Sequence, residues 1–175
     1  TWAGGAGARG LAIQWAPART ASEEEKRLSE VQDLQEARYR TLVEHAPEAI
    51  VVLDVDLGRI VDANQNALRL FGLSREELYR LAPAQLSSPV QADGRDAGEL
   101  AAQYVARAVK GEAPVFEWVH RNAAGEDIVC EVRLVRLPDQ SRVLVRGSVI
   151  DITQRKQVLA ALRDSEAKFA TIFRN

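Results

Sequence analysis

The sequence predicts an α+β fold: a five-stranded antiparallel sheet with short helices on one face, and an amphipathic helix at each end. Polar and apolar residues alternate in two short stretches within 49–64, which indicates strands with one buried face. The same alternation returns in three stretches between 115 and 152. Helical spacing of apolar residues marks the segments around these strands, at 21–43, 64–109 and 154–175.

Length and composition fit one globular domain with flanking helices, since the chain has 175 residues and 46% of them are hydrophobic. A net charge of −2 offers no basic surface for nucleic acid. No apolar run reaches the ~20 residues of a membrane helix, so we expect no direct membrane contact. The single cysteine, Cys130, excludes an internal disulfide and is consistent with a cytoplasmic location. Because methionine is absent, we expect an excerpt of a longer protein, which could itself be membrane-anchored.

The first helix is expected over 21–43. Ser22 and Glu25 in the string SEEE match a capping box, in which each side chain accepts the other residue's backbone N–H. Pro47 ends the helical pattern. Residues 1–20, rich in Gly and Ala, are interpreted as a linker or the end of a preceding domain.

An apolar seam at near-helical spacing runs along this helix through Leu28, Val31, Leu34 and Leu42. Two core-like positions in it, Gln35 and Arg38, are polar, which predicts an imperfect coiled coil. The seam has little to bury against within the domain, so we expect a parallel homodimer.

Two strands within 49–64 are followed by a helix from about Asn64, with Gly72 as its stop signal. The string SREE at 74–77 is a second capping box. A turn-rich stretch then leads into a helix over 98–109.

Three strands follow, over 115–121, 126–137 and 142–152, joined by turns at NAAG and PDQS. If Phe116 faces inward, alternation also turns Trp118 and His120 inward. The same reasoning gives the other two strands an inward face formed by Ile128, Cys130, Val132, Leu134, Val143, Val145, Gly147 and Val149.

Several strings within this element order resemble the PAS domain of sensor proteins over about residues 39–156. They are EHAPEAIVVLD at 44–54, DANQNALRLFGLSREEL at 62–78 and GSVIDITQRK at 147–156. The resemblance implies a PAS domain over 44–153, followed by an exit helix over 154–175. It also implies that the concave sheet face holds a ligand, where a mostly apolar pocket would have His120 as its polar anchor. The expected ligand-binding residues are Phe116, Trp118, His120, Cys130, Val132, Gly147 and Val149.

The string Asp151-Ile152-Thr153 looks like the family's junction with its output helix, which implies a signal relay there. Gln154 stands where the family more often has an acidic residue, so the polar contact usual at that position is in doubt. EARYRTLVEH at 36–45 is echoed by EAKFATIFRN at 166–175, which predicts that a second PAS repeat begins there. Such arrays usually feed a histidine kinase, a cyclic-dinucleotide enzyme such as a diguanylate cyclase, or a chemoreceptor, so we expect further PAS and output domains in the same chain.

The cofactor is not determined by the resemblance. Haem-binding relatives mostly take a histidine from the helix before the third strand, and 88–110 contains none, which disfavours haem. Photoactive flavin domains need a cysteine that 64–110 lacks. Non-covalent flavin stays open, with Trp118 and His120 as ring contacts.

Catalysis has little support in this chain, because two histidines and one cysteine make no metal cluster and no activated nucleophile is evident. Three hypotheses therefore remain: a sensor module that binds a small ligand, a ligand-free scaffold for dimerisation and spacing, and a flavin redox sensor.

Overall fold

The computed structural model describes residues 20–172, and the side chains of residues 20–169. The chain divides into two units, and the boundary lies between Tyr39 and Arg40 within the first helix. The prediction that residues 1–20 form a linker or the end of a preceding domain concerns residues that, except for Thr20, lie outside the described range. The end of the predicted second repeat, at 173–175, also lies outside it. Within the described part, no helix combines the length and apolar character that crossing a membrane requires.

Helix α1 spans Ala21–Glu44, and its capping box differs from the predicted one. The Thr20 N–H donates to Glu23 Oε2 at 3.0 Å, and the Glu23 N–H donates to Thr20 Oγ1 at 3.4 Å. The prediction of a box at Ser22 and Glu25 is therefore wrong. The sequence TASEEE satisfies the capping pattern at two offsets, and the earlier offset adds residues to the helix.

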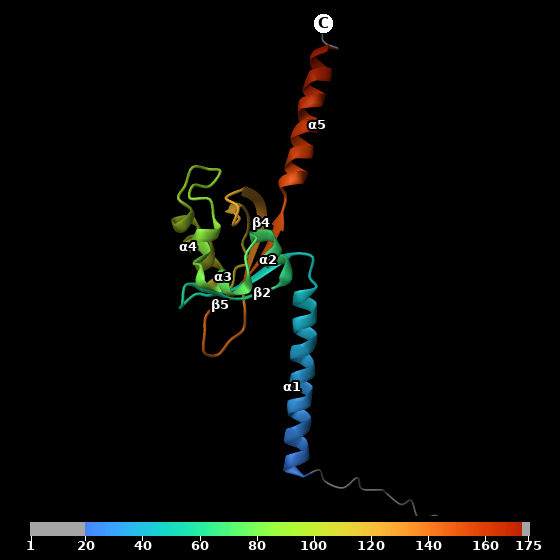
Figure 1. The fold of residues 1–175 in the computed structure, drawn as a ribbon, viewed down its shortest axis with the longest axis vertical. Helices are drawn as coiled ribbons and strands as arrows, with labels where there is room; N and C mark the ends of the chain where they lie inside the picture. Colours follow the sequence, from blue (N-terminus) through green and yellow to red (C-terminus); the bar gives the residue numbers. More distant parts are fainter. Residues whose placement is uncertain (1–19, 173–175) are drawn as a thin grey trace, which may run out of the picture. The chain divides into compact units, whose positions relative to one another are not determined.

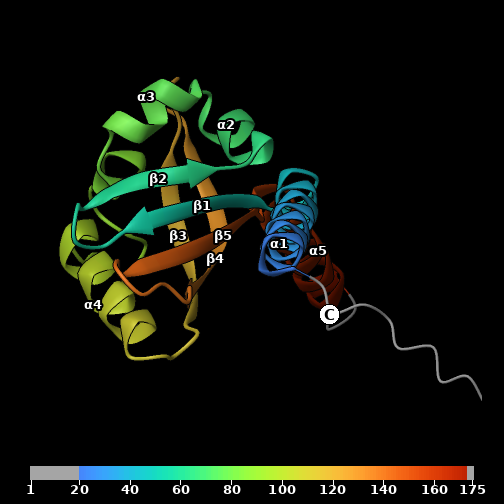
Figure 2. The same cartoon turned by 90° about the horizontal axis from the view of Figure 1, so that it is seen from below.

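The sheet has five antiparallel strands in the order β2-β1-β5-β4-β3 (Figure 2). Its strands are β1 Ala49–Asp54, β2 Arg59–Ala63, β3 Val115–Arg121, β4 Asp127–Arg136 and β5 Leu144–Asp151. The first and last strands in the sequence, β1 and β5, pair with each other inside the sheet, with Ala49 opposite Val149. The predicted α+β fold is confirmed, and β4 and β5 are slightly shorter than predicted.

Short helices connect β2 to β3 and pack on the sheet (Figure 1). They are α2 Gln65–Phe71, α3 Arg75–Arg80, the 3₁₀ helix η1 Pro83–Leu86 and α4 Ala97–Val109. Helix α5 follows the last strand over Thr153–Ile172. Between the sheet and the short helices lies a core of buried side chains that includes Phe71, Leu78, Leu100, Trp118 and Val149.

The turn between α2 and α3 follows from two local signals. Gly72 ends α2 with φ of 67°, a left-handed conformation that glycine adopts without steric cost. Ser74 and Glu77 form the predicted capping box at the start of α3, with the Ser74 N–H donating to Glu77 Oε2 at 2.8 Å. These signals redirect the chain within three residues, so that both helices can cover the same part of the sheet.

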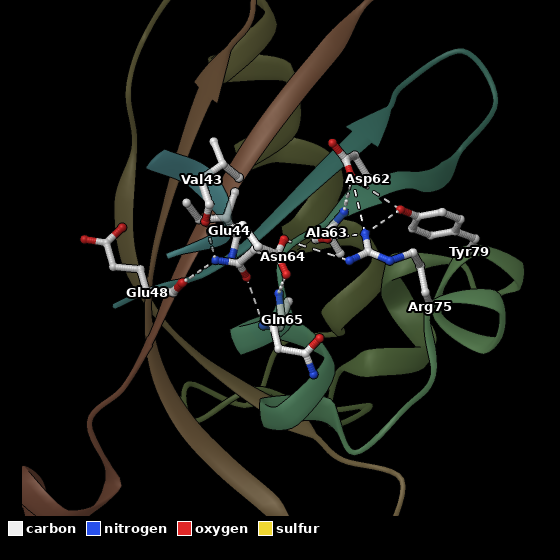
Figure 3. Close-up of polar contacts among 11 residues, drawn as sticks. Val43, Glu44, Glu48, Asp62, Ala63, Asn64, Gln65, Arg75 and Tyr79 are labelled. Carbon is white, nitrogen blue, oxygen red and sulfur yellow. Dashed lines mark hydrogen bonds and ion pairs between the residues drawn. The ribbon is translucent and has the colours of Figure 1, made fainter. Parts of the chain in front are cut away.

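Asn64 joins α1, β1 and α2 through four hydrogen bonds, and its side chain is fully buried (Figure 3). Its Oδ1 accepts the N–H groups of Ile50 at 2.9 Å and Ala67 at 3.0 Å. Its Nδ2 donates to the carbonyls of Val43 and Glu48, both at 2.9 Å. An amide side chain has two donor hydrogens and an oxygen with two lone pairs, so the hydrogen-bonding capacity of Asn64 is completely used.

A second polar group strengthens the same junction. The Glu44 Oε1 accepts the Gln65 N–H at 3.2 Å, at the positive end of α2, and Oε2 lies 3.9 Å from Arg75 Nη2. Arg75 Nη1 also donates to the Ala63 carbonyl and to Tyr79 Oη (Figure 3). The last turn of α1 is thus held by both backbone and side-chain contacts.

We predict that Asn64→Ala lowers the free energy of unfolding by about 3 kcal/mol, because it leaves buried amides and carbonyls without partners. Asn66→Ala is the matched control, since Asn66 Nδ2 makes one bond across this junction, to the Ala46 carbonyl. The control should cost no more than about 1 kcal/mol. Urea unfolding of both variants measures the difference, and equal losses would contradict the central role of Asn64.

Candidate functional site

A cavity of about 100 Å³ lies between the sheet and the short helices. The sheet contributes Val132 from β4, together with Val145, Gly147 and Val149 from β5. Helical residues close the other side, among them Phe71, Leu86, Ala101 and Tyr104. Within the described residues only Ser87, Tyr104, Trp118 and His120 bring polar atoms to the side chains of this wall, so the cavity is mostly apolar.

Strand β3 turns Phe116, Trp118 and His120 toward this cavity, as the alternation predicts. Trp118 is buried, and its Nε1–H donates to Ser87 Oγ at 2.9 Å. The ring of Phe116 stacks on Tyr104, with centroids 3.6 Å apart and planes 4° from parallel. These contacts make the aromatic side chains part of the core and of the cavity wall at the same time.

His120 has one ring nitrogen satisfied and one unsatisfied. Its Nδ1 lies 2.9 Å from the Leu86 carbonyl, which can only accept, so Nδ1 carries the hydrogen. Nε2 is then a bare acceptor, and it is buried without a hydrogen-bond partner among the described residues. Burial lowers the pKa of His120 from 6.5 to about 4, although the bond to Leu86 works in the opposite direction. The imidazole is therefore neutral near pH 7.

Two predicted ligand-binding residues have other roles in the structure. Cys130 is fully buried opposite Trp118 and does not line the cavity. Burial raises the pKa of its thiol to about 12, which makes it unreactive. Gly147 does line the cavity, but a Cβ there would lie 3.2 Å from Val51 Cγ2 and 3.5 Å from Leu134 Cδ2. Cross-strand neighbours thus take much of the space that the missing side chain would otherwise leave for a ligand.

The turn-rich segment before α4, which contains Ser88 and Gln91, covers the edge strand β3. The Gln91 side chain accepts the Val119 N–H at 2.8 Å and donates to the Val119 carbonyl at 3.1 Å. The Ser88 N–H also donates to Val119, at 2.9 Å. Gln91 therefore pairs with the strand edge as another backbone would. No local pattern identifies such a glutamine, because its partner is 28 residues away.

The exit from the domain is attached to β4 through one residue. The Ile152 N–H donates to the Val129 carbonyl at 2.9 Å, and Ile152 is buried. Thr153 Oγ1 accepts the Val129 N–H at 3.1 Å, and Asp151 Oδ1 accepts the Thr153 N–H at 2.8 Å. Gln154 is exposed, and Lys156 in the same turn pairs with Glu117 of β3. The first turn of α5 is thus tied to the strands that form the cavity.

A flavin or a haem is larger than this cavity. An engineered apolar cavity of roughly 150 Å³ accommodates benzene, and this cavity of about 100 Å³ is smaller than that. Its wall has few polar groups to match the ring nitrogens and carbonyls of a flavin. Within the described residues, no group of three or more His, Cys, Asp or Glu side chains is placed to hold a metal ion.

We predict that His120 makes the fold sensitive to acid. The unfolded imidazole titrates near 6.5 and the folded one near 4, so between these values the unfolded state binds more protons. Stability is therefore complete above pH 6.5 and declines as the pH falls toward 4, by on the order of 3 kcal/mol. Urea unfolding of wild type and His120→Gln between pH 4 and 6.5 separates the contribution of His120 to the free energy of unfolding from that of the carboxylates. If the free energies of the two proteins change with pH in parallel, the acid sensitivity does not come from His120.

Comparisons with known proteins agree with this fold. A family model described as PAS fold matches residues 43–157. A domain of a sensory box sensor histidine kinase/response regulator from Geobacter sulfurreducens is 30% identical, with a TM-score of 0.54, over 67% of this chain and 94% of that one. The PAS domain of an HTR-like protein from Haloarcula marismortui is 26% identical, with a TM-score of 0.57, over 75% and 99%.

A more distant match shows the fold alone. The LOV protein of Rhodobacter sphaeroides is 16% identical, with a TM-score of 0.56, over 69% of this chain and 68% of that one. No curated protein sequence matches the chain. The family match covers more than half of the residues, and the sheet order and helices agree with it. The chain belongs to the PAS family, as a sensor domain similar to those of sensor histidine kinases.

Proposed function

We propose that this domain is the sensor module of a larger signal-transduction protein, in which a small neutral ligand occupies the cavity and biases the exit helix α5. The chain itself performs no catalytic step in this proposal. The output is assigned to another part of the parent chain, a histidine kinase or a diguanylate cyclase domain, and the protein to the cytoplasmic side. The similar domain from Geobacter sulfurreducens comes from a sensor histidine kinase/response regulator, which supports the first of these outputs.

The observation that carries the proposal is the continuity between the cavity wall and α5. Val149 of β5 lines the cavity, and Asp151, Ile152 and Thr153 follow directly. Ile152 and Thr153 both bond to Val129, which lies in β4 three residues before the cavity-lining Val132. A ligand that displaces β4 or β5 slightly therefore acts on the anchors of α5, and a ligand shifts such an equilibrium only by its differential affinity for the two arrangements.

A ligand-free scaffold is the second candidate, and the small cavity volume favours it.

Homodimerisation belongs to both candidates. The seam of α1 is exposed in the single chain, with Leu28 62% and Leu42 74% accessible, so a second copy would bury it. Replacing Leu28 and Val31 by Asp should then give folded monomers. Light scattering that already finds the parent chain monomeric at high micromolar concentration would contradict the dimer.

We predict that at least one probe smaller than benzene binds the cavity. Xenon, dichloromethane and isopropanol should raise the melting temperature of the full chain, because ligands that bind only the folded state stabilise it. Ala101→Leu provides the control: Ala101 lines the cavity, and a leucine there should fill it and remove the effect. Absence of binding by all three probes would refute the sensor function and leave the scaffold.

We predict that Thr153→Val loosens the start of α5 while the core stays intact. The substitution keeps the shape of Thr153 but removes its bonds to the Val129 N–H and carbonyl. Amide hydrogen exchange in the first turn of α5 should become about tenfold faster, equivalent to a bond of roughly 1.4 kcal/mol. Gln154→Ala, on the exposed side of the same turn, should leave exchange unchanged. Equal exchange in Thr153→Val and wild type would contradict the relay.

A further inference from the structure

Strand β3 forms one edge of the sheet, and its residue Val119 is covered there. The Val119 N–H donates to Gln91 Oε1 at 2.8 Å, and the Val119 carbonyl accepts the Ser88 N–H at 2.9 Å. Both backbone groups of Val119 therefore point away from β4. Every second residue of an antiparallel strand directs its backbone groups to the same side, and the pairing of β3 with β4 is regular. The N–H and carbonyl groups of Val115 and Glu117 thus also point away from β4.

The part of this edge that precedes Val119 is open. Among residues 20–169, neither Val115 nor Glu117 forms a backbone hydrogen bond outside the sheet. The side chain of Val115 is also 47% exposed. Unpaired N–H and carbonyl groups along the edge of a sheet are a template for pairing with another strand. The edge of β3 is therefore closed at Val119 and available for pairing at Val115 and Glu117.

A cleft of about 300 Å³ lies beside this edge. Leu100 and Tyr104 line the cleft from α4, and Val129 and Lys156 line it from β4 and α5. Leu100 belongs to the core on the helix-covered face of the sheet, whereas Lys156 pairs with the outward-facing Glu117. The cleft thus gives room on both faces of the sheet, where alternate side chains of an added strand would lie. The side chain on the helix-covered face would contact Leu100 and Tyr104 and should be apolar.

The charges on the outer face favour a basic side chain there. Glu117 lies directly opposite Glu131, and both side chains are exposed. Lys156 pairs with Glu117, whereas Glu131 has no ion pair within the described part of the chain. The next basic residue along β4, Arg133, lies opposite Val115 instead. Because like charges on directly opposite residues destabilise a sheet, a basic residue is favoured beside Glu117. Two-fold pairing of β3 with a second copy would instead bring two Glu117 side chains together.

We propose that a partner protein adds an extended segment to the open edge of β3, with alternating basic and apolar side chains. Backbone hydrogen bonds to Val115 and Glu117 hold the segment, a basic side chain lies beside Glu117, and an apolar one enters the cleft. The inference goes beyond the sensor function and does not depend on the core cavity. Because Lys156 belongs to the first turn of α5, the partner binds next to the exit helix.

The first test titrates the full chain with a hexapeptide of alternating lysine and valine, blocked at both ends. At saturation, amide hydrogen exchange of Val115 and Glu117 should slow about tenfold, the effect of one hydrogen bond. The Val119 amide should not change, because it is already bonded to Gln91. A peptide with glutamate in place of lysine should bind about fivefold more weakly at low salt. Unchanged exchange at millimolar peptide, or equal affinity for the two peptides, would overturn the proposal.

Two methylated peptides separate strand pairing from simple charge attraction in the wild-type protein. One carries N-methyl groups on its lysine nitrogens, and the other carries them on its valine nitrogens. Alternate N–H groups of a strand face opposite sides, so one of these peptides should bind like the parent and the other should fail. Equal binding by both would show attraction by charge alone and would overturn the proposal.

A pair of variants tests the same edge from the side of the protein. Glu117→Pro removes the outward N–H, which an edge strand tolerates, and Glu117→Gln removes the charge but keeps the N–H. The lysine peptide should bind Glu117→Pro at least about tenfold more weakly than Glu117→Gln. Slow exchange of Val115 and Glu117 before any peptide is added would also overturn the proposal. If that protection grew with protein concentration, the occupant would be a second copy, and otherwise the chain itself.

Discussion

The structure depends first on the side chain of Asn64, because it bonds to three elements that begin or end near it. The Val43 carbonyl lies in the last turn of α1, the Ile50 N–H opens β1, and the Ala67 N–H lies in the first turn of α2. All three bond to one fully buried amide. Because a hydrogen bond depends steeply on distance and angle, four of them on one planar group define the relative positions of these segments closely.

The position of β1 in turn determines the cavity. β1 lies in the middle of the sheet next to β5, with Val51 opposite Gly147 and Ala49 opposite Val149. Val51 lines the cavity and approaches Gly147, so a shift of β1 by one residue would turn a different set of side chains into the core. The entry junction at Asn64 and the exit anchor at Val129 therefore act on the two sides of the same strand, β5.

How much of the fold and of the site can be predicted from the sequence depends on how far apart in the chain the contacting residues lie. Alternation along β3 places Phe116, Trp118 and His120 correctly, because a period of two needs only neighbouring residues. Capping signals locate α3 for the same reason, and where two signals overlap, as at Thr20 and Ser22, the sequence does not distinguish them.

Local sequence patterns do not predict contacts between residues that lie far apart in the chain. The four partners of Asn64 and the pairing of Gln91 with Val119 join separate parts of the chain. Cavity volume is a small difference between the space enclosed by the elements and the side chains that fill it, so composition alone cannot supply it. The tautomer of His120 likewise depends on Leu86, 34 residues earlier.

The neutral state of His120 bears on the energetics of the fold. The domain bears the cost of a buried acceptor that has no partner within residues 20–169. His120 lies opposite Ile128 of β4, next to Val129, the residue that anchors Ile152 and Thr153. One pair of strands thus joins the segment that carries this ring nitrogen to the first turn of α5.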